Sequence, residues 1–308
     1  MDDLGFVEHL RPRAVFILSS AHSGSTWIGY VLGSTPQSAF LGEFSRAWDD
    51  QLRVPCTLCA CRGAETCEVL HDIEARPEEE AFALAAARTN RPVLVDNSKQ
   101  IDWARKFLHS GDLDVRVIHV VKDPRSWFAS ARRRHGWPVA DAMAIWCREN
   151  QAMRAFVRST GTRGVTVCYD VLARLPRRHF SRLFGFCGLP YSDAALQYWT
   201  FEHHGFAANG ATDACIKSAG PLAVPSHFAT GDDAFYQRNS RRFFRDDRWR
   251  SELTPQEEAA IRTHPEVCGL LSSLGYRMTR RGMGSLRWWS RLDSAWRSPP
   301  EDLPRPAG

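Results

Sequence analysis

The chain has 308 residues, of which 44% are hydrophobic and 24% are charged, and its formal net charge at pH 7 is +5. This length and composition are typical of a globular protein with one large domain, and they exclude a largely disordered chain. The charge is too small to require a nucleic-acid partner, but it suffices for a basic cleft that binds a small polyanion.

The compartment is predicted from three features of the sequence. No stretch approaches the roughly 20 consecutive apolar residues of a membrane span. The N-terminal residues 1–13 are acidic and interrupted by charges, unlike a secretory signal. The nine cysteines are odd in number and scattered, which favours reduced thiols. We therefore expect a cytoplasmic protein without integral membrane association, whose oligomeric state cannot be read from the sequence.

The first predicted strand, residues 13–20, is apolar throughout, as is typical of a strand buried on both faces of a parallel sheet. A helix is predicted from Ser25 to Gly33, so residues 19–25 form a strand-to-helix turn. This turn reads like a phosphate-binding loop around Gly24. However, Ser19 and Ser25 stand where a nucleoside-triphosphate loop has its first glycine and its lysine.

Backbone N–H groups at a helix N-terminus form an anion site, and hydroxyl groups add further donors. Without the lysine and the first glycine, one terminal phosphate suits the loop better than a triphosphate with Mg²⁺. The predicted ligands are Ser23, Gly24, Ser25, Thr26 and Trp27.

Further strands are predicted at residues 92–98, 115–121 and 164–170. Helices are predicted directly before residue 92 and at residues 124–134 and 139–158. Strands that alternate with helices indicate a parallel sheet whose ligands bind at the carboxyl ends of the strands. The predicted fold class is therefore α/β, with a P-loop-NTPase-like parallel sheet flanked by helices in a single domain with loop or lid insertions.

The second half of the chain has a looser pattern. Residues 203–237 are rich in Gly, Ala and Ser and are predicted to form a long loop or lid. Two short helices follow Thr254, which is predicted as an N-cap. We expect the main domain to span residues 1–280, and residues 281–308 to form an amphipathic helix and a disordered tail. The apolar face of this helix would dock on the domain or, alternatively, contact a membrane surface or a substrate channel. The face consists of Leu286, Trp289, Leu292 and Trp296.

Four cysteines, Cys56, Cys59, Cys61 and Cys67, lie in one short stretch. Four thiolates can bind zinc in a tetrahedral site, but the spacing between Cys59 and Cys61 is cramped. We interpret the stretch as a structural loop and assign no metal ligand. Whether these cysteines bind zinc, form disulfides or are free stays open.

Four segments, in order, carry a family resemblance: "HSGSTW" (22–27), "VIHVVKDPRSWFASARRR" (117–134), the stretch 168–193 that begins "CYD", and the basic stretch 238–257. Together they resemble the sulfotransferases that use 3′-phosphoadenosine-5′-phosphosulfate (PAPS), over about residues 14–276. The text "FLGEF" and "DNSK" (96–99) is most similar to bacterial and to carbohydrate- or tyrosyl-type members.

The resemblance implies nucleotide ligands beyond the loop. Lys122 and Ser130 would hold the 3′-phosphate, and Tyr169 would lie near the adenine nucleotide. Arg241 and Arg245 would close over the 3′-phosphate. The family usually has Arg at the position of Lys122. A lysine cannot make the bidentate contact of an arginine, and Arg125 would compensate for that loss.

The resemblance also implies three catalytic residues. Glu43 matches the general base, although a capping or ion-pair role is the alternative. His22 replaces the usual Arg or Lys at the leaving oxygen, where it would act as an imidazolium, unless it is simply a surface histidine. Lys99, or Ser98 instead, would contact the sulfuryl group or the leaving phosphate.

The predicted function is a sulfotransferase that moves a sulfuryl group from PAPS to a hydroxyl or an amine of a small-molecule acceptor. The displacement is in line, Glu43 is the general base, the product is 3′-phosphoadenosine-5′-phosphate (PAP), and no metal is required. The acceptor itself cannot be read from the sequence. The alternatives are a nucleotide kinase or other phosphotransferase on a P-loop-like fold, and a non-catalytic nucleic-acid or zinc-binding protein.

Overall fold

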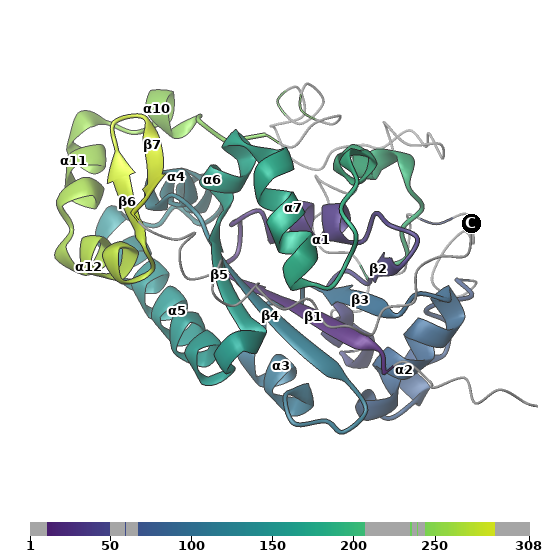
Figure 1. Ribbon diagram of the computed structural model, residues 1–308. Helices are drawn as coiled ribbons and strands as arrows, with labels where there is room; N and C mark the ends of the chain where they lie inside the picture. The colour runs from purple at the N-terminus through teal and green to yellow at the C-terminus, as the bar shows by residue number, and fades with distance from the viewer. Residues whose placement is uncertain are drawn as a thin grey trace, which may run out of the picture.

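The computed structural model describes residues 11–49, 59, 67–206, 235, 239 and 244–286. Its centre is a five-stranded sheet in the order β2-β3-β1-β4-β5, in which all neighbouring strands are parallel (Figure 1). The strands are β1 (Arg13–Ser19), β2 (Ser38–Phe40), β3 (Val93–Asp96), β4 (Asp114–Val121) and β5 (Gly164–Cys168). The predicted α/β fold class is confirmed.

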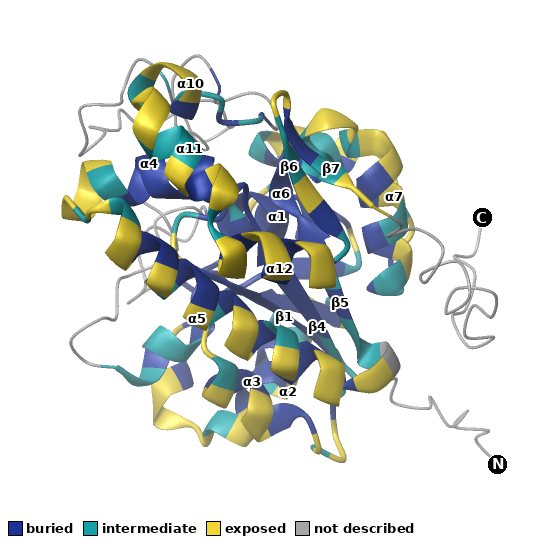
Figure 2. Cartoon of the chain, turned by 90° about the vertical axis from the view of Figure 1, so that its left-hand side faces the viewer, coloured by how far each residue is buried: buried dark blue, intermediate teal, exposed yellow. Residues whose placement is uncertain are grey.

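Helices cover both faces of the sheet, and their outer surfaces are the exposed ones (Figure 2). The α-helices are α1 (Ser25–Leu32), α2 (Glu78–Thr89), α3 (Ile101–Phe107), α4 (Pro124–His135), α5 (Val139–Ser159), α6 (Tyr169–Arg174), α7 (Pro176–Phe186), α10 (Trp249–Glu252), α11 (Pro255–Thr263) and α12 (Pro265–Ser273). Short 3-10 helices are η1 (Phe44–Trp48), η2 (Ile73–Ala75), η3 (Gly161–Arg163) and η4 (Asp193–Thr200).

Alternate residues of β1 enter two separate hydrophobic clusters, because successive side chains of a strand point to opposite faces. Phe16 and its face pack with α2, α3 and the last turns of α5. Ile17 and its face pack with α1, α6, α7 and η4. The burial of β1 from both sides explains why its sequence is a continuous apolar run rather than an alternating one.

The C-terminal elements pack beside α4 and α5 in a third cluster. An antiparallel hairpin of β6 (Tyr276–Thr279) and β7 (Gly282–Ser285) lies next to α11 and α12 (Figure 1). Thr254 caps α11 through a reciprocal capping box with Glu257, which confirms the predicted N-cap. The hairpin continues past residue 280, where we expected the domain to end.

Two differences from the predicted elements have simple causes. The sequence does not predict β2, because three residues are too few to show a periodic pattern. The strand predicted at 164–170 ends at Cys168, because Tyr169 already begins α6.

Several predictions fall outside the described residues: most of the loop or lid, Arg241, Cys56 and Cys61, and the C-terminal helix and tail beyond Leu286. Among the described residues, no helix combines the length and apolar character that crossing a membrane requires.

The carboxyl ends of the strands bring the predicted site together. Each predicted part of the site follows one strand of the parallel sheet. The anion loop follows β1, the "DNSK" stretch lies at the end of β3, Lys122 follows β4 and Tyr169 follows β5. Since parallel strands end at one edge of the sheet, these segments share that edge.

Candidate functional site

The loop after β1 has an unusual backbone at two positions. His22 has φ 65° and Gly24 has φ 84°, both in the left-handed region. Left-handed residues in a turn direct successive N–H groups to one side, and here the turn leads into α1. Ser23, Ser25, Thr26 and Trp27 are all buried at this helix N-terminus. The turn therefore has a backbone that an anion loop could use, and the anion itself stays a prediction.

Gly24 is required for its left-handed backbone conformation and also because the Tyr169 ring packs directly against its Cα. A Cβ atom at this position would lie 2.3 Å from two ring carbons of Tyr169. The Tyr169 hydroxyl donates a hydrogen bond to the carbonyl of Phe244 at 2.5 Å, which anchors the ring beneath the loop. Tyr169 thus supports the loop backbone, a contact that the sequence did not indicate.

Lys122 joins the loop to the second predicted anion site. Its Nζ donates to the carbonyl oxygen of His22 at 3.2 Å and lies 6.0 Å from the ring centroid of Tyr169. Burial lowers the pKa of Lys122, and the nearby carboxylates of Asp246 and Asp170 oppose that shift. The two corners therefore adjoin each other.

Ser130 lies on the second turn of α4, where it donates to the Ser126 carbonyl at 3.1 Å. The guanidinium of Arg133, one turn later, donates to the Ser130 hydroxyl at 3.3 Å. Arg133 also lies 4.0 Å from a carboxylate oxygen of Asp246, and Lys122 lies 3.9 Å from the same oxygen. The predicted phosphate ligands thus belong to a cationic corner that includes Arg133.

Asp246 is the acidic centre of this corner. Arg248 holds both of its carboxylate oxygens at 2.9 Å. Burial alone would raise the pKa of Asp246, but the Arg248 hydrogen bonds and the charge of Lys122 lower it to about 2. The carboxylate therefore stays charged near neutral pH and orients the cations around it.

Two arginines are held by carboxylates that lie close to them in the chain. Arg245 donates to a carboxylate oxygen of Asp247 and to the carbonyl of Arg281, and its role over the 3′-phosphate stays a prediction. Arg125 is fully buried, where its guanidinium pairs with Asp123 at 2.8 Å and lies 4.1 Å from the Trp249 ring centroid. Arg125 therefore does not compensate for Lys122, because Asp123, which also caps α4, holds it within the protein.

Glu43 forms ion pairs through both carboxylate oxygens. Lys99 Nζ lies 2.5 Å from Oε1, and Arg46 Nη2 lies 2.7 Å from Oε2. Only 6% of the Glu43 surface is exposed. The pairs fix the orientation of the carboxylate at the same edge of the sheet as the loop.

Asp96 organises the backbone on both sides of this pair. It accepts hydrogen bonds from the N–H groups of Phe44 and Ser98, from the Ser98 hydroxyl and from the Trp103 indole. Burial raises the pKa of Asp96 to about 6, although these hydrogen bonds oppose the shift. Ser98 is therefore committed to Asp96, and Lys99, at φ 66°, is the residue of "DNSK" that reaches Glu43.

His22 differs from its predicted charge state. Burial first, and then the charges of Arg134, Lys122, His135 and Lys99, together lower its pKa to about 3. The ring is therefore neutral near pH 7 rather than an imidazolium. Its Nε2 lies 3.4 Å from Nε2 of His135, a neighbour that the sequence did not suggest.

The sequence missed Arg46, Arg133, Asp246 and Arg248. The sequence spacing could have indicated two of these residues. Arg133 follows Ser130 by three residues on a predicted helix, and Arg46 follows Glu43 by three residues. The Asp246–Arg248 pair lies in the stretch 238–257 that carries the resemblance, but a charge run by itself does not show which of its residues pair.

Comparison with known proteins agrees with the arrangement. The family model described as "Sulfotransferase family" matches residues 12–193. A search of curated proteins by sequence finds no match.

Among solved structures, the chain is similar to the sulfotransferase domain of the curacin biosynthetic pathway, with 16% identity and a TM-score of 0.56, covering 87% of this chain and 99% of that one. It is also similar to the sulfotransferase domain of the Synechococcus PCC 7002 olefin synthase, with 20% identity and a TM-score of 0.54, covering 88% and 98%. These likenesses show the fold. Because the family model covers more than half of the chain, including the anion loop, Glu43 and Lys122, this protein is an enzyme of the sulfotransferase family.

Proposed function

We propose that this sulfotransferase takes the sulfuryl group from PAPS, delivers it to a hydroxyl or amine of a small-molecule acceptor, and releases PAP. The observation that carries the proposal is the 3.2 Å contact between Lys122 Nζ and the His22 carbonyl. It joins a loop that suits a 5′-phosphosulfate to a corner where Ser130 and Arg133 suit a 3′-phosphate. A ligand with an anionic group at each end of an adenosine matches such a pair of corners.

The proposed reaction is an in-line displacement at sulfur. The acceptor oxygen or nitrogen forms the new bond to sulfur, and its proton passes to the Glu43 carboxylate. The bond from sulfur to the bridging oxygen breaks, and its electron pair leaves with the 5′-phosphate of PAP. N–H donors of the loop would stabilise the charge that develops on that phosphate.

Lys99 has two roles in this proposal. Its ion pair holds the Glu43 carboxylate in one orientation, which a general base needs. Its ammonium also lies at the carboxyl end of β3, beside the strand that leads into the anion loop, where it would contact the sulfuryl group or the leaving phosphate. The reaction as proposed requires no metal.

The acceptor would enter where two distant segments meet. Phe206 donates to the Leu41 carbonyl at 3.1 Å and accepts from the Glu43 N–H at 3.3 Å. Gly42 makes this approach possible, since a Cβ there would lie 1.8 Å from the Phe206 carbonyl oxygen. The base is thus positioned by the segment at residue 206 as well as by its own loop.

The proposed compartment is the cytoplasm, as the sequence predicts.

A binding screen tests the donor. Thermal unfolding of the protein is measured with PAP, AMP, ADP and ATP, each with and without Mg²⁺. We expect PAP alone to raise the melting temperature selectively, because only PAP engages both corners. A larger shift with ATP and Mg²⁺ would overturn the proposal in favour of phosphoryl transfer.

A further inference from the structure

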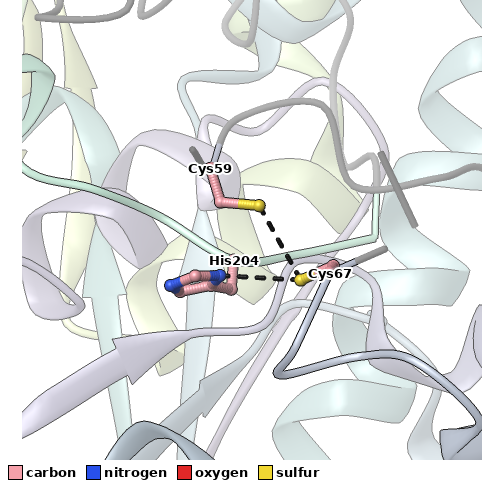
Figure 3. Close-up of side chains that lie close together, drawn as sticks. All are labelled: Cys59, Cys67 and His204. Carbon is pink, nitrogen blue, oxygen red and sulfur yellow. Dashed lines mark hydrogen bonds between the residues drawn. The ribbon is translucent and has the colours of Figure 1, made fainter. Parts of the chain in front are cut away.

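Two cysteine thiols and one histidine imidazole lie close together outside the proposed transfer site. The side chains of Cys59, Cys67 and His204 point toward one another, although His204 lies far along the chain from both cysteines (Figure 3). Their donor atoms all lie within 4.8 Å of one another. Two thiols and an imidazole are a donor set that zinc prefers in proteins.

The two donor distances at Cys67 fit a tetrahedral metal. Zn–S bonds of about 2.3 Å and Zn–N bonds of about 2.1 Å separate two sulfur ligands by about 3.8 Å, and sulfur from nitrogen by about 3.6 Å. The Cys59 and Cys67 sulfurs are 3.7 Å apart, and Cys67 Sγ lies 3.6 Å from Nδ1 of His204. A disulfide would need a sulfur–sulfur distance of about 2.05 Å, so these two cysteines are not bonded to each other.

The surroundings hold these ligands in place. Cys59 and Cys67 are buried within the hydrophobic cluster on one face of the sheet. The N–H groups of Leu70 and His71 donate to the Cys67 carbonyl, which fixes a tight turn at that residue. His204 lies two residues before Phe206, whose backbone bonds to Leu41 and Glu43.

We propose that Cys59, Cys67 and His204 bind a zinc ion that ties the segment at Cys67 to the segment that positions Glu43. Each thiol would release its proton to solvent on binding, and no electron is transferred. Three protein ligands leave one tetrahedral position for a further ligand. The proposed role is to hold the two segments together, and the inference does not depend on the proposed sulfuryl transfer.

Metal analysis of the purified protein tests the site. The chain is dialysed against metal-free buffer and its zinc is measured by plasma mass spectrometry. We expect about one zinc per chain in the wild type, and loss of most of it in Cys67→Ser and His204→Ala. Cys268→Ser and His109→Ala alter an exposed thiol and an exposed imidazole, so these controls should keep their zinc.

Cobalt provides a second readout that does not require a folded variant. Wild-type protein stripped by a chelator and titrated with Co²⁺ should show the thiolate charge-transfer and intense visible bands of tetrahedral cobalt. Zinc should then displace those bands. Absence of stoichiometric metal and of these bands in the wild type would overturn the proposal, as would full zinc retention by both folded ligand variants.

Discussion

The ammonium of Lys99 lies 2.5 Å from Oε1 of Glu43, and the backbone of Lys99 has the left-handed φ of 66°. A non-glycine residue rarely adopts this conformation, and such strain tends to persist where the surroundings enforce it at functional sites. The preceding residue, Ser98, is held by Asp96 through its N–H and its hydroxyl, and the Phe44 N–H after Glu43 bonds to the same carboxylate. The strained residue and the proposed base are therefore positioned by one buried carboxylate.

Glu43→Gln tests the base. The amide keeps the shape of the side chain but cannot accept the acceptor proton, so we expect turnover of PAPS to fall at least about 100-fold. The affinity for PAP, measured by calorimetry, should change less than about twofold because Glu43 is not a nucleotide ligand. Turnover is measured as PAP formation with a panel of small alcohols, phenols and amines. Glu79→Gln, at an exposed position on α2, is the matched control. Retained turnover in Glu43→Gln would remove Glu43 as the base.

Ser130→Ala tests the 3′-phosphate corner. A hydrogen bond to a charged group contributes about 1.5–3 kcal/mol, so PAP should bind about 10- to 140-fold more weakly. AMP lacks the 3′-phosphate, and its dissociation constant should stay within about twofold of the wild-type value. Lys122→Ala should weaken PAP more strongly and AMP as well, because Lys122 also holds the His22 carbonyl of the anion loop. Ser159→Ala removes another hydroxyl that bonds to its own helix, at the far end of α5, and should leave both affinities unchanged. Equal losses for PAP and AMP in Ser130→Ala would place the 3′-phosphate elsewhere.

The sequence predicted the parts of the site that follow directly from strand ends. Apolar runs located β1, β3 and β4, and the polar residues after them had to share one edge of a parallel sheet. Lys99, Lys122 and the loop residues are accordingly at that edge, whereas Glu43 reaches it after β2, a strand that the sequence did not predict. Their proposed roles stay predictions.

The remaining features depend on tertiary contacts that no local pattern encodes. The positive φ of His22 gives no signal, because glycine is the residue that usually marks such a turn. The resemblance places Arg125 at the nucleotide, but Asp123, two residues earlier, captures its guanidinium inside the protein. His204 contacts Cys67 two residues before Phe206, which pairs with the segment after β2.

Gly24→Ala tests the loop backbone. The left-handed conformation costs a non-glycine residue about 1–2 kcal/mol, and the new methyl group would also meet the Tyr169 ring. Gly136→Ala is a matched control: Gly136 has φ 68°, but a Cβ atom there would meet nothing within 4 Å in the described part of the chain. We expect urea unfolding to show a loss of about 1–2 kcal/mol for Gly136→Ala and a larger one for Gly24→Ala. Only Gly24→Ala should lose PAP binding. Equal costs at the two positions would mean that Tyr169 does not constrain the loop.

The charge of His22 should change when the loop binds an anion. In the free protein, burial and four nearby cationic or titratable groups lower its pKa to about 3, so the ring is neutral across pH 5–8. A bound phosphate would offset those positive charges and raise the pKa of His22. A complex with a higher pKa takes up a proton on binding, so the affinity for PAP should rise as the pH falls.

Calorimetry of PAP binding to the wild type and to His22→Gln, from pH 8 to pH 5.5, isolates this effect. Titration of PAP itself is common to both proteins, so the difference between their pH profiles belongs to His22. We expect the wild type to gain affinity relative to the variant as the pH falls, and to take up more protons per PAP bound, as measured in buffers of different ionisation enthalpy. Parallel pH profiles would show that His22 stays neutral in the complex. In that case the loop would stabilise the leaving phosphate through its backbone N–H groups and neutral donors, without a positive charge from His22.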